Sequence, residues 1–314
     1  EEALAGATIS CRVGLRDAED RPVGSVAEAR FMQADLEARL PDGTLLMRAS
    51  TWRDRFFRVP HEFYQARFRP REAFLGHAAD LFDAGPDVTI WRLPAFPHGF
   101  LEDAGGLWTR LLVNTMLSRP ERNQWAAMTG PLRRRRDWLT GRIALKEAAR
   151  AWIAAHHGVL CLPADMVIAV AEGGKPHLDP GSLAVLGIGH APEISLAHSG
   201  GGAIAVAAPP GRAAGIDMEG VEGVDAALLA EGGFSEVEIA LLGEGPDPAR
   251  LLAGWCAKEA VAKMSGEGLN GRPRAFVLDR IGADSATVQR PDGRRIDVSL
   301  ARDGATIMAL SVEG

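Results

Sequence analysis

A short segment near the middle of the chain, GIDMEG at residues 215–220, carries two carboxylates two positions apart. In an extended strand, residues two apart point to the same face, so Asp217 and Glu219 would lie side by side and Met218 would point to the other face. Two carboxylates this close repel each other unless a cation lies between them. An isolated pair of this kind is usually a solvated strand end, whereas with a third carboxylate it would suit a hard cation such as Mg²⁺.

A second segment, WCAKEAVAK at residues 255–263, offers that third carboxylate. Residues four apart share a helix face, so Glu259 and Lys263 point the same way. Taken alone they form a surface pair that adds roughly 0.2–0.5 kcal/mol to a helix. If Glu259 joins the two carboxylates of the strand, Lys258 and Lys263 could instead flank phosphates and act on the charge that develops in phosphoryl transfer.

Charge is distributed unevenly along the chain. Between residues 119 and 150 there are nine basic residues against three acidic ones, and between residues 217 and 247 there are nine acidic residues and no Lys or Arg. One basic and one acidic segment could together build a site for an anion and a metal cation.

The overall composition limits the class of protein. The chain has 314 residues, 46% hydrophobic residues and a net charge of −6. This length allows about two domains of 100–200 residues, and the acidic balance argues against a nucleic-acid partner, which requires a basic surface. Three scattered cysteines suit a reducing compartment. No apolar run approaches the ~18 residues of a membrane helix, so we expect a cytoplasmic protein without a membrane partner.

The elements that must position these residues are predicted from periodicity and turn residues. Residues 1 to about 60 read as strands with a Pro-Asp-Gly turn between the second and third, and residues 60–97, broken by five prolines, read as a linker. Residues 133–157 form the clearest predicted helix, with an apolar stripe and Gly158 as its stop. Further helices are expected at 101–117, 235–242 and 251–264, and short strands elsewhere.

A helix followed by strands occurs twice, at about 132–208 and 235–312. This order indicates an internally duplicated α+β unit, although the two sequences do not visibly match.

The two chemical segments also form a paired signature. The motif G-[IV]-D-x-E followed at a distance by [FW]-[CS]-x-K-E-[AS]-x-x-K resembles that of the 4′-phosphopantetheinyl transferases, and Asp217 and Glu259 are 42 positions apart. GGKPHL at 173–178, ISLAHS at 194–199 and DWLTGRIALKEAAR at 137–150 are similar to further family segments, in the family's order. The Asp-x-Glu form resembles the larger pseudodimeric type named after the surfactin transferase. This resemblance implies an α+β fold of two similar halves, residues 98–210 and 211–314.

The resemblance also implies residue roles. Mg²⁺ would be held by Asp217, Glu219 and Glu259, and Glu259 or a water would be the general base. Lys263 would stabilise charge on the transferring phosphate, with Lys258 also against phosphate. Coenzyme A would be bound by Arg142, Arg136, His198 and Ser199 near its 3′-phosphate and by Lys175 and Pro176 beside its adenine and ribose. A serine of an acyl carrier protein would attack the β-phosphate of coenzyme A, and 3′,5′-ADP would leave.

The amino-terminal part, residues 1–97, resembles a different kind of protein. ARLPDGTLLMRASTWRDRFFRVPHEFY is similar to the closing strands of the hot-dog dehydratase region of iterative polyketide synthases. The dehydratase motif H-x-x-x-G-x-x-x-x-P is absent, so no dehydration is expected. A transferase after such a region resembles the carboxyl end of enediyne-type synthases, which implies a role in polyketide antibiotic biosynthesis.

Two other functions fit parts of the sequence. A non-catalytic docking or scaffold module could retain coenzyme A binding, but a decayed site would be expected to lose at least one of the three carboxylates and two lysines. A nucleotide phosphoesterase would need a second metal cluster, and the sequence offers none.

Overall fold

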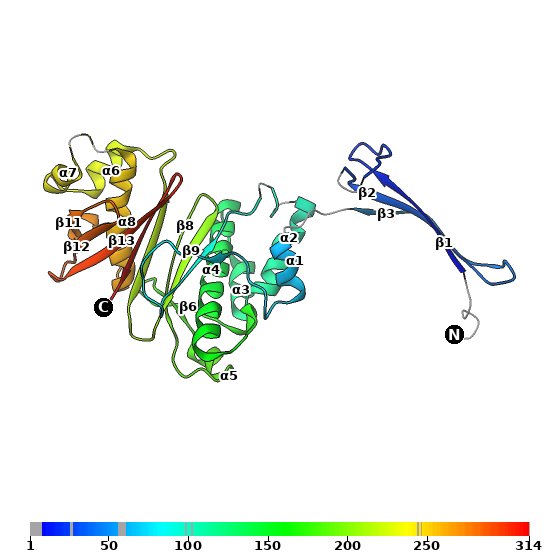
Figure 1. The fold of residues 1–314 in the computed structure, drawn as a ribbon, viewed down its shortest axis with the longest axis horizontal. Coiled ribbons are helices and arrows are strands. Elements are labelled where there is room, and N and C mark those ends of the chain that lie inside the picture. The colour runs from blue at the N-terminus through cyan, green and yellow to red at the C-terminus, as the bar shows by residue number, and fades with distance from the viewer. Residues whose placement is uncertain are drawn as a thin grey trace. The chain divides into compact units, whose positions relative to one another are not determined.

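The computed structural model describes residues 8–25, 28–55, 61–97, 99–101, 103–243, 245 and 247–313. The chain divides into two compact units, Glu1–His61 and Glu62–Gly314, whose elements are drawn in Figure 1. The sequence placed the domain boundary at residue 98, whereas the structure places the division between His61 and Glu62. The expected linker contains a helix and two strands, His61–Phe68, His77–Ala78 and Thr89–Leu93, and the strands belong to a sheet of the second unit.

The first unit is a three-stranded antiparallel sheet in the order β1 (Thr8–Arg16), β2 (Phe31–Arg39) and β3 (Leu45–Arg55). The turn between β2 and β3 is the Pro-Asp-Gly segment, where Gly43 has a φ of 87° and Asp42 accepts a hydrogen bond from the Thr44 amide at 2.9 Å. The three predicted strands and the turn are therefore confirmed, while residues 1–7, 26–27 and 56–60 of the predicted β region lie outside the described part.

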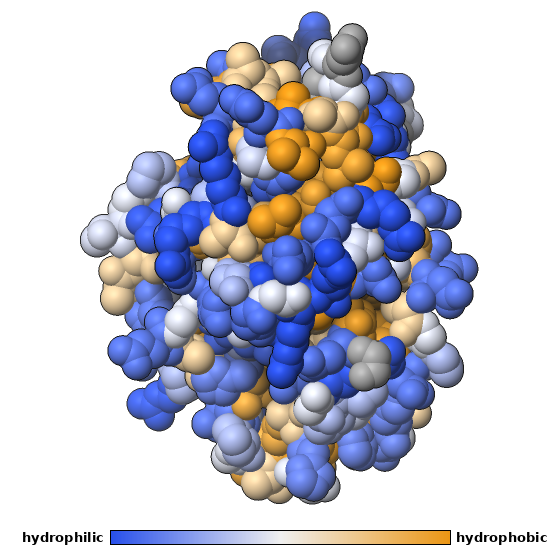
Figure 2. Space-filling view, turned by 90° about the vertical axis from the view of Figure 1, so that its left-hand side faces the viewer, coloured by the Kyte–Doolittle hydropathy of each residue, from blue (hydrophilic) through white to orange (hydrophobic). Residues whose placement is uncertain are grey.

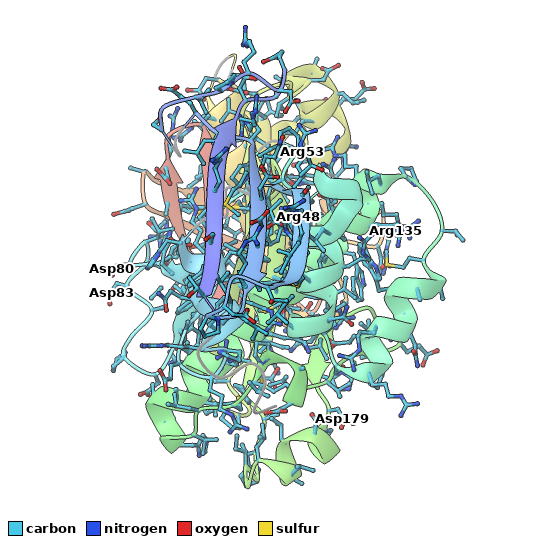
Figure 3. The ribbon with its side chains drawn as sticks, turned by 90° about the vertical axis from the view of Figure 1, so that its right-hand side faces the viewer. Arg48, Arg53, Asp80, Asp83, Arg135 and Asp179 are labelled. Carbon is cyan, nitrogen blue, oxygen red and sulfur yellow. The ribbon has the colours of Figure 1, made fainter. Side chains whose placement is uncertain are left out.

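The register of this sheet separates apolar from charged residues. Ile9 pairs with Ala38, and Ala38 with Met47, which places all three on one face. On the other face Glu37 pairs with Arg48, and Arg48 and Arg53 both extend from β3 (Figure 3). The apolar face includes Trp52, and the exposed fractions of Met47 and Trp52 are 52% and 54%. This unit thus shows an amphipathic sheet with a largely exposed apolar face.

The second unit contains two antiparallel sheets and a short hairpin. The first sheet has the order β4 (His77–Ala78), β5 (Thr89–Leu93), β9 (Gly202–Ala208) and β8 (Glu193–Ser199). The second has the order β10 (Ala214–Gly220), β14 (Thr306–Val312), β13 (Arg295–Asp303), β12 (Ser285–Gln289) and β11 (Val277–Ile281). The hairpin consists of β6 (Ile168–Val170) and β7 (Pro176–Leu178).

Eight α-helices and two 3₁₀ turns occur in the described residues. They are α1 (His61–Phe68), α2 (Asp103–Met116), α3 (Arg119–Ala127), α4 (Leu132–His157), α5 (Pro180–Val185), α6 (Ala226–Gly233), α7 (Glu236–Leu242), α8 (Pro248–Ser265), η2 (Pro163–Asp165) and η3 (Pro273–Ala275). The four predicted helices are confirmed as α2, α4, α7 and α8. None of the described helices is long and apolar enough to cross a bilayer.

Each sheet of the second unit is covered by one long helix. The helix α4 packs on β5, β8 and β9, and α8 packs on β10, β13 and β14. Gly158, in the left-handed conformation, ends α4 as predicted. Asp247 caps the start of α8 by accepting from the Arg250 amide, so α8 begins three residues before the expected position.

The two sheets meet where β8 lies beside β10. Ser195 and Ser199 on β8 accept hydrogen bonds from the β10 amides of Ile216 at 3.3 Å and Gly220 at 3.1 Å. Apolar residues of both sheets, including Ile204 and Met308, form one buried cluster beneath this junction. The structure confirms a mixed α+β fold with several antiparallel sheets, and the junction places β8, β10 and α8 around one cavity.

Candidate functional site

A cavity of about 460 Å³ lies at the junction of the two sheets. Its walls come from β8, β10, α8, the loop between β6 and β7, and the turn after α8. The lining residues are Gly173, Gly174, Lys175, Pro176, Ser195, Leu196, Ala197, His198, Asp217, Glu219, Glu259, Lys263, Gly266 and Gly268. The structure therefore brings seven of the named residues to one cavity: Asp217, Glu219, Glu259, Lys263, Lys175, Pro176 and His198.

The strand β10 presents its two carboxylates by simple alternation. Asp217 and Glu219 line the cavity, while Met218 is 3% exposed and packs in the cluster beneath. Gly215, at the start of the same motif, lies directly against α8: a Cβ added there would meet the Ala260 carbonyl oxygen at 2.0 Å. Only glycine fits this contact, and the close approach brings the α8 side chains within reach of β10.

The helix α8 supplies one acid and one base. Glu259 and Lys263 lie one turn apart and both line the cavity. The Lys263 ammonium donates a 2.6 Å hydrogen bond to Oδ1 of Asp217, whose side chain is 5% exposed. This ion pair joins α8 to β10 inside the cavity.

Burial and mutual repulsion shift the pKa values of these groups. Burial, reinforced by the charges of Asp217 and Glu259, raises the pKa of Glu219 to about 7. Burial and Asp217 also raise the pKa of Glu259. For Lys263, burial would lower the pKa, but Asp217 and Glu259 outweigh it and raise the pKa above the ordinary value. The cavity therefore favours additional positive charge.

The donor set fits a hard cation. Among the described residues no three His, Cys, Asp or Glu side chains stand close enough to form a ready-made metal site. However, Oδ2 of Asp217 is buried and has no hydrogen-bond partner in the described part of the chain, which is a costly state for a carboxylate oxygen. An orphaned carboxylate oxygen with two further carboxylates on the same cavity suits Mg²⁺, which takes few protein oxygens besides water and phosphate.

Of the residues predicted to contact the nucleotide portion of coenzyme A outside the arginines, three line the carboxylate cavity and Ser199 does not. Lys175 and Pro176 line the cavity, and Lys175 also donates to Glu193 at 2.8 Å. The exposed His198 borders both this cavity and a neighbouring one of about 1020 Å³. Ser199 lies at the end of β8 beyond the lining residues and accepts from the Gly220 amide, so its hydroxyl holds β8 to β10.

The predicted arginines lie outside the carboxylate cavity. Arg142 lines the neighbouring 1020 Å³ cavity together with His198, and its Nη1 donates to the Ile168 carbonyl at 2.9 Å. Its guanidinium also lies 5.0 Å from the centre of the Trp138 ring. Arg136 lines a third cavity, of about 410 Å³. The sequence grouped both arginines with His198; Arg142 shares a cavity with His198, whereas Arg136 does not.

The expectation for Lys258 is wrong. Its side chain is fully buried, and its ammonium contacts Oε1 of Glu238 at 2.6 Å and donates to the Gly233 carbonyl at 2.8 Å. Because consecutive helical residues are rotated by about 100°, Lys258 points into the core while Glu259 points into the cavity. Lys258 therefore holds α8 in place and does not reach a ligand in the cavity.

One known protein family matches the carboxyl-terminal part of the second unit. Residues 213–312 match the family model of the 4′-phosphopantetheinyl transferase superfamily. The chain thus contains a domain of that superfamily. This transferase domain includes Asp217, Glu219, Glu259 and Lys263, whereas Lys175 and His198 lie before it. No curated protein matches the chain.

Sequence reasoning missed several residues around the transferase domain. Glu238, the partner of Lys258, is the third helical residue of α7 and forms a capping box with Ser235; the Ser-x-x-Glu spacing was the available signal. Ser195 also lines the cavity, three residues before the predicted His198 on the same strand β8. Arg133 and Arg134 line the neighbouring cavity, whereas the sequence assigned a role only to Arg136 of this run of arginines.

The superfamily domain also exposes apolar side chains, as the three-stranded sheet of the first unit does. Figure 2 shows hydrophobic side chains among hydrophilic ones in the upper half of the face at the left of Figure 1, where α6 and α7 lie. Leu228 in α6 and Val237 in α7 are 67% and 80% exposed. They lie on the same unit as the cavity but outside its lining.

Proposed function

We propose that this chain transfers the 4′-phosphopantetheine group of coenzyme A to a serine of an acyl carrier protein in a Mg²⁺-dependent reaction. The observation that carries this proposal is the meeting of Asp217, Glu219, Glu259 and Lys263 on one cavity, within the part of the chain that matches the superfamily. The activity corresponds to holo-[acyl-carrier-protein] synthase, and the fold to the pseudodimeric type.

The three carboxylates would hold the metal ion. When bound, Mg²⁺ would neutralise charge on the pyrophosphate of coenzyme A. Lys263, which keeps its positive charge because of Asp217 and Glu259, would stabilise charge on the phosphate being transferred.

The reaction is a displacement at phosphorus. The serine oxygen forms a bond to the β-phosphorus of coenzyme A, and the bond from that phosphorus to the oxygen of 3′,5′-ADP breaks. The serine proton passes to Glu259 or to a water that Glu259 orients. Lys175, Pro176 and His198 would bind the nucleotide portion, and Arg142 would border the 3′-phosphate from the neighbouring cavity, which His198 also lines.

The context that we propose is polyketide biosynthesis. The amphipathic three-stranded sheet of residues 8–55 and its Pro-Asp-Gly hairpin support the resemblance to a hot-dog dehydratase region. A carrier domain of a parent synthase of the enediyne type is then a candidate acceptor, and the expected location is the cytoplasm.

The test is the mass of the carrier protein. Incubation with coenzyme A, Mg²⁺ and each of several carrier proteins should add one phosphopantetheine group. Glu259→Gln should lower the rate on the order of 10²-fold or more. Glu236→Gln, an exposed glutamate in α7, is the control and should leave the rate unchanged. A wild-type chain that binds coenzyme A equally with and without Mg²⁺ and modifies no carrier would instead support the docking-module function.

A further inference from the structure

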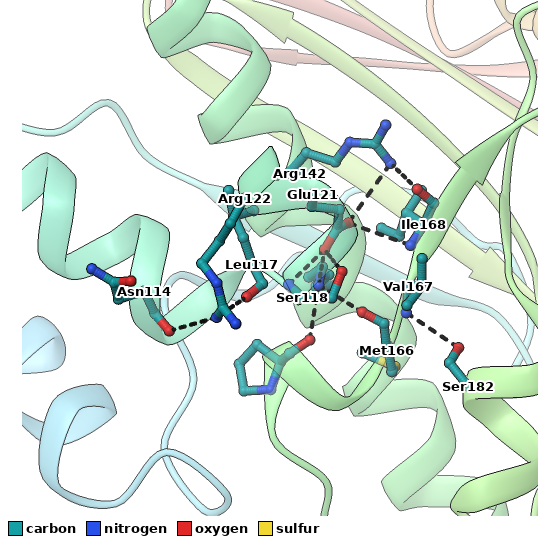
Figure 4. Close-up of polar contacts among 12 residues, drawn as sticks. Asn114, Leu117, Ser118, Glu121, Arg122, Arg142, Met166, Val167, Ile168 and Ser182 are labelled. Carbon is teal, nitrogen blue, oxygen red and sulfur yellow. Dashed lines mark hydrogen bonds and ion pairs between the residues drawn. The ribbon is translucent and has the colours of Figure 1, made fainter. Parts of the chain in front are cut away.

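Glu121 is the centre of a buried polar network that the proposed mechanism does not use (Figure 4). Its side chain is 0% exposed. One carboxylate oxygen accepts from the amide and hydroxyl of Ser118 at 2.8 and 2.6 Å and contacts the Lys146 ammonium at 2.5 Å. The other accepts from the Ile168 amide at 3.3 Å. A single carboxylate thus joins α3, α4 and the first residue of β6.

The start of β6 is held from both sides. Glu121 accepts from the amide of Ile168, and Arg142 donates to the carbonyl of the same residue at 2.9 Å. Lys146 donates to the carbonyls of Pro163 and Met166, at 2.9 and 2.7 Å, in the turn that leads into the strand. Each of these three charged side chains is at most 6% exposed.

The clamped strand leads directly to the cavity. Ile168 pairs with Leu178 in the β6–β7 hairpin, and Val170 pairs with Pro176. The loop of this hairpin carries Gly173, Gly174 and Lys175, which form one wall of the carboxylate cavity. A shift at Ile168 would therefore move the wall that faces the nucleotide in the proposed reaction.

The second half of the unit repeats this network at the other wall. Glu238 accepts from the Ser235 amide at 2.7 Å and from the Leu278 amide at 2.7 Å, and contacts Lys258 at 2.6 Å. Lys258 donates to the Gly233 carbonyl at 2.8 Å and to the Pro273 carbonyl at 3.4 Å. The order Ser-x-x-Glu, helical Lys, 3₁₀ turn and strand amide is the same in both halves.

The two networks support different walls. Lys258 directly precedes Glu259 on α8, so the second network sets the helix that carries the reacting groups. The first network sets the hairpin that carries Lys175. Buried ion pairs contribute little net stability compared with apolar residues of similar volume, so stability alone does not explain two matched networks next to one cavity.

We propose that Glu121 is a positioning residue for the nucleotide-binding wall of the cavity. It acts through the Ile168 amide on the β6–β7 hairpin, and so controls the affinity for coenzyme A and not the rate of transfer. This inference rests on the proposed function, because it identifies the hairpin wall as the coenzyme A side of the site.

The experiment compares the two networks in the full chain. Glu121→Gln should raise KM for coenzyme A about tenfold and leave kcat within twofold. The matched variant Glu238→Gln should lower kcat about tenfold and leave KM within twofold. Ser118→Ala removes a donor to Glu121 without touching the Ile168 contact, and should lower Tm while KM stays unchanged. Glu121→Asp keeps the charge on a shorter side chain and should give a smaller rise in KM.

Direct binding separates this inference from the proposed function. The Kd of coenzyme A, measured by calorimetry without a carrier protein, should rise about tenfold in Glu121→Gln. Wild-type chain that binds coenzyme A but modifies no carrier would overturn the proposed function, and the Kd comparison would still decide the role of Glu121. An unchanged KM and Kd with a lowered Tm would show a purely structural role. If Glu121→Gln does not fold, an unchanged KM in Glu121→Asp would overturn the inference.

Discussion

Two neighbouring residues of the same motif have opposite roles. Glu259 lines the cavity, and Lys258 is fully buried against Glu238. Burial lowers the pKa of Lys258, and the contact with Glu238 partly offsets this effect. At the scale of the single residue, the face of α8 on which a side chain lies determines whether it lines the cavity or packs in the core.

Lys258→Ala should therefore affect folding before catalysis. Removing the ammonium leaves the carboxylate of Glu238, which is 1% exposed, without its partner. Loss of one member of a buried ion pair costs about 3–5 kcal/mol. Urea denaturation would measure the change, with Lys175→Ala as the control, because its pair with Glu193 is only partly buried. A variant as stable as the wild type would contradict the assigned role.

A second buried acid, Glu147, predicts a dependence of stability on pH. Burial raises its pKa to about 7 although Arg150 lies 2.7 Å away, and its Oε1 has no partner among the described residues. A raised pKa means that the folded state binds the proton more tightly, so this group stabilises the fold below about pH 4.5 and loses that effect as pH rises through about 7.

Glu147→Gln should remove this contribution. Relative to the variant, the free energy of unfolding of the wild type should fall by about 3 kcal/mol across this range, at 1.36 kcal/mol per pKa unit. Denaturation at several pH values between 5 and 8 would check it. If the free energy of unfolding of the wild type instead stays constant relative to that of the variant, or rises relative to it as pH increases, Glu147 is ionised in the folded state throughout this range.

At the scale of elements, the cavity depends on how closely α8 packs on β10. Gly215 permits this contact, since an added Cβ would meet backbone atoms of α8 at 2.0 and 2.5 Å. Two equivalent networks, centred on Glu121 and Glu238, then fix the hairpin and the helix on either side. The chemistry requires these elements to be held to within a fraction of an ångström.

Gly215→Ala should push α8 away from β10. Overpacking of this kind costs typically about 1–3 kcal/mol, and the shift should separate Lys263 from Asp217 and lower the transfer rate about 10²-fold. Gly189→Ala is the matched control, because an added Cβ there meets nothing within 4 Å. Equal activity of the two variants would show that the close packing is not required.

At the scale of the molecule, the chain consists of two compact units. Every described residue that lines the candidate cavity lies between Gly173 and Gly268, within the unit Glu62–Gly314. The first unit, Glu1–His61, contributes an amphipathic sheet. The segment from His77 to Leu93 belongs with the second unit, because β5 pairs with β9 along its whole length.

A chain that starts at Glu62 should therefore keep its activity. We expect its kcat and its KM for coenzyme A to stay within twofold of those of the full chain. A chain that starts at residue 98 lacks β5, leaves the edge of β9 unpaired, and should fold poorly. Rates and far-ultraviolet circular dichroism of both would measure this. Full activity of the shorter chain would contradict the observed boundary.

The local features of this protein can be read from its amino-acid order. Alternation in GIDMEG placed Asp217 and Glu219 on one face, and Gly158 marked the end of α4. These features depend on short-range periodicity and on backbone conformations that few residues adopt, so they can be predicted without knowledge of the rest of the chain.

Which distant segments cover each face became visible only in the folded chain. Folding placed Lys258 against Glu238, directed Arg142 to the Ile168 carbonyl, and added β5 to the sheet of the second unit. A buried charge takes whichever partner the packing of remote elements brings within hydrogen-bond distance, and no pattern within a single helix or strand encodes that choice.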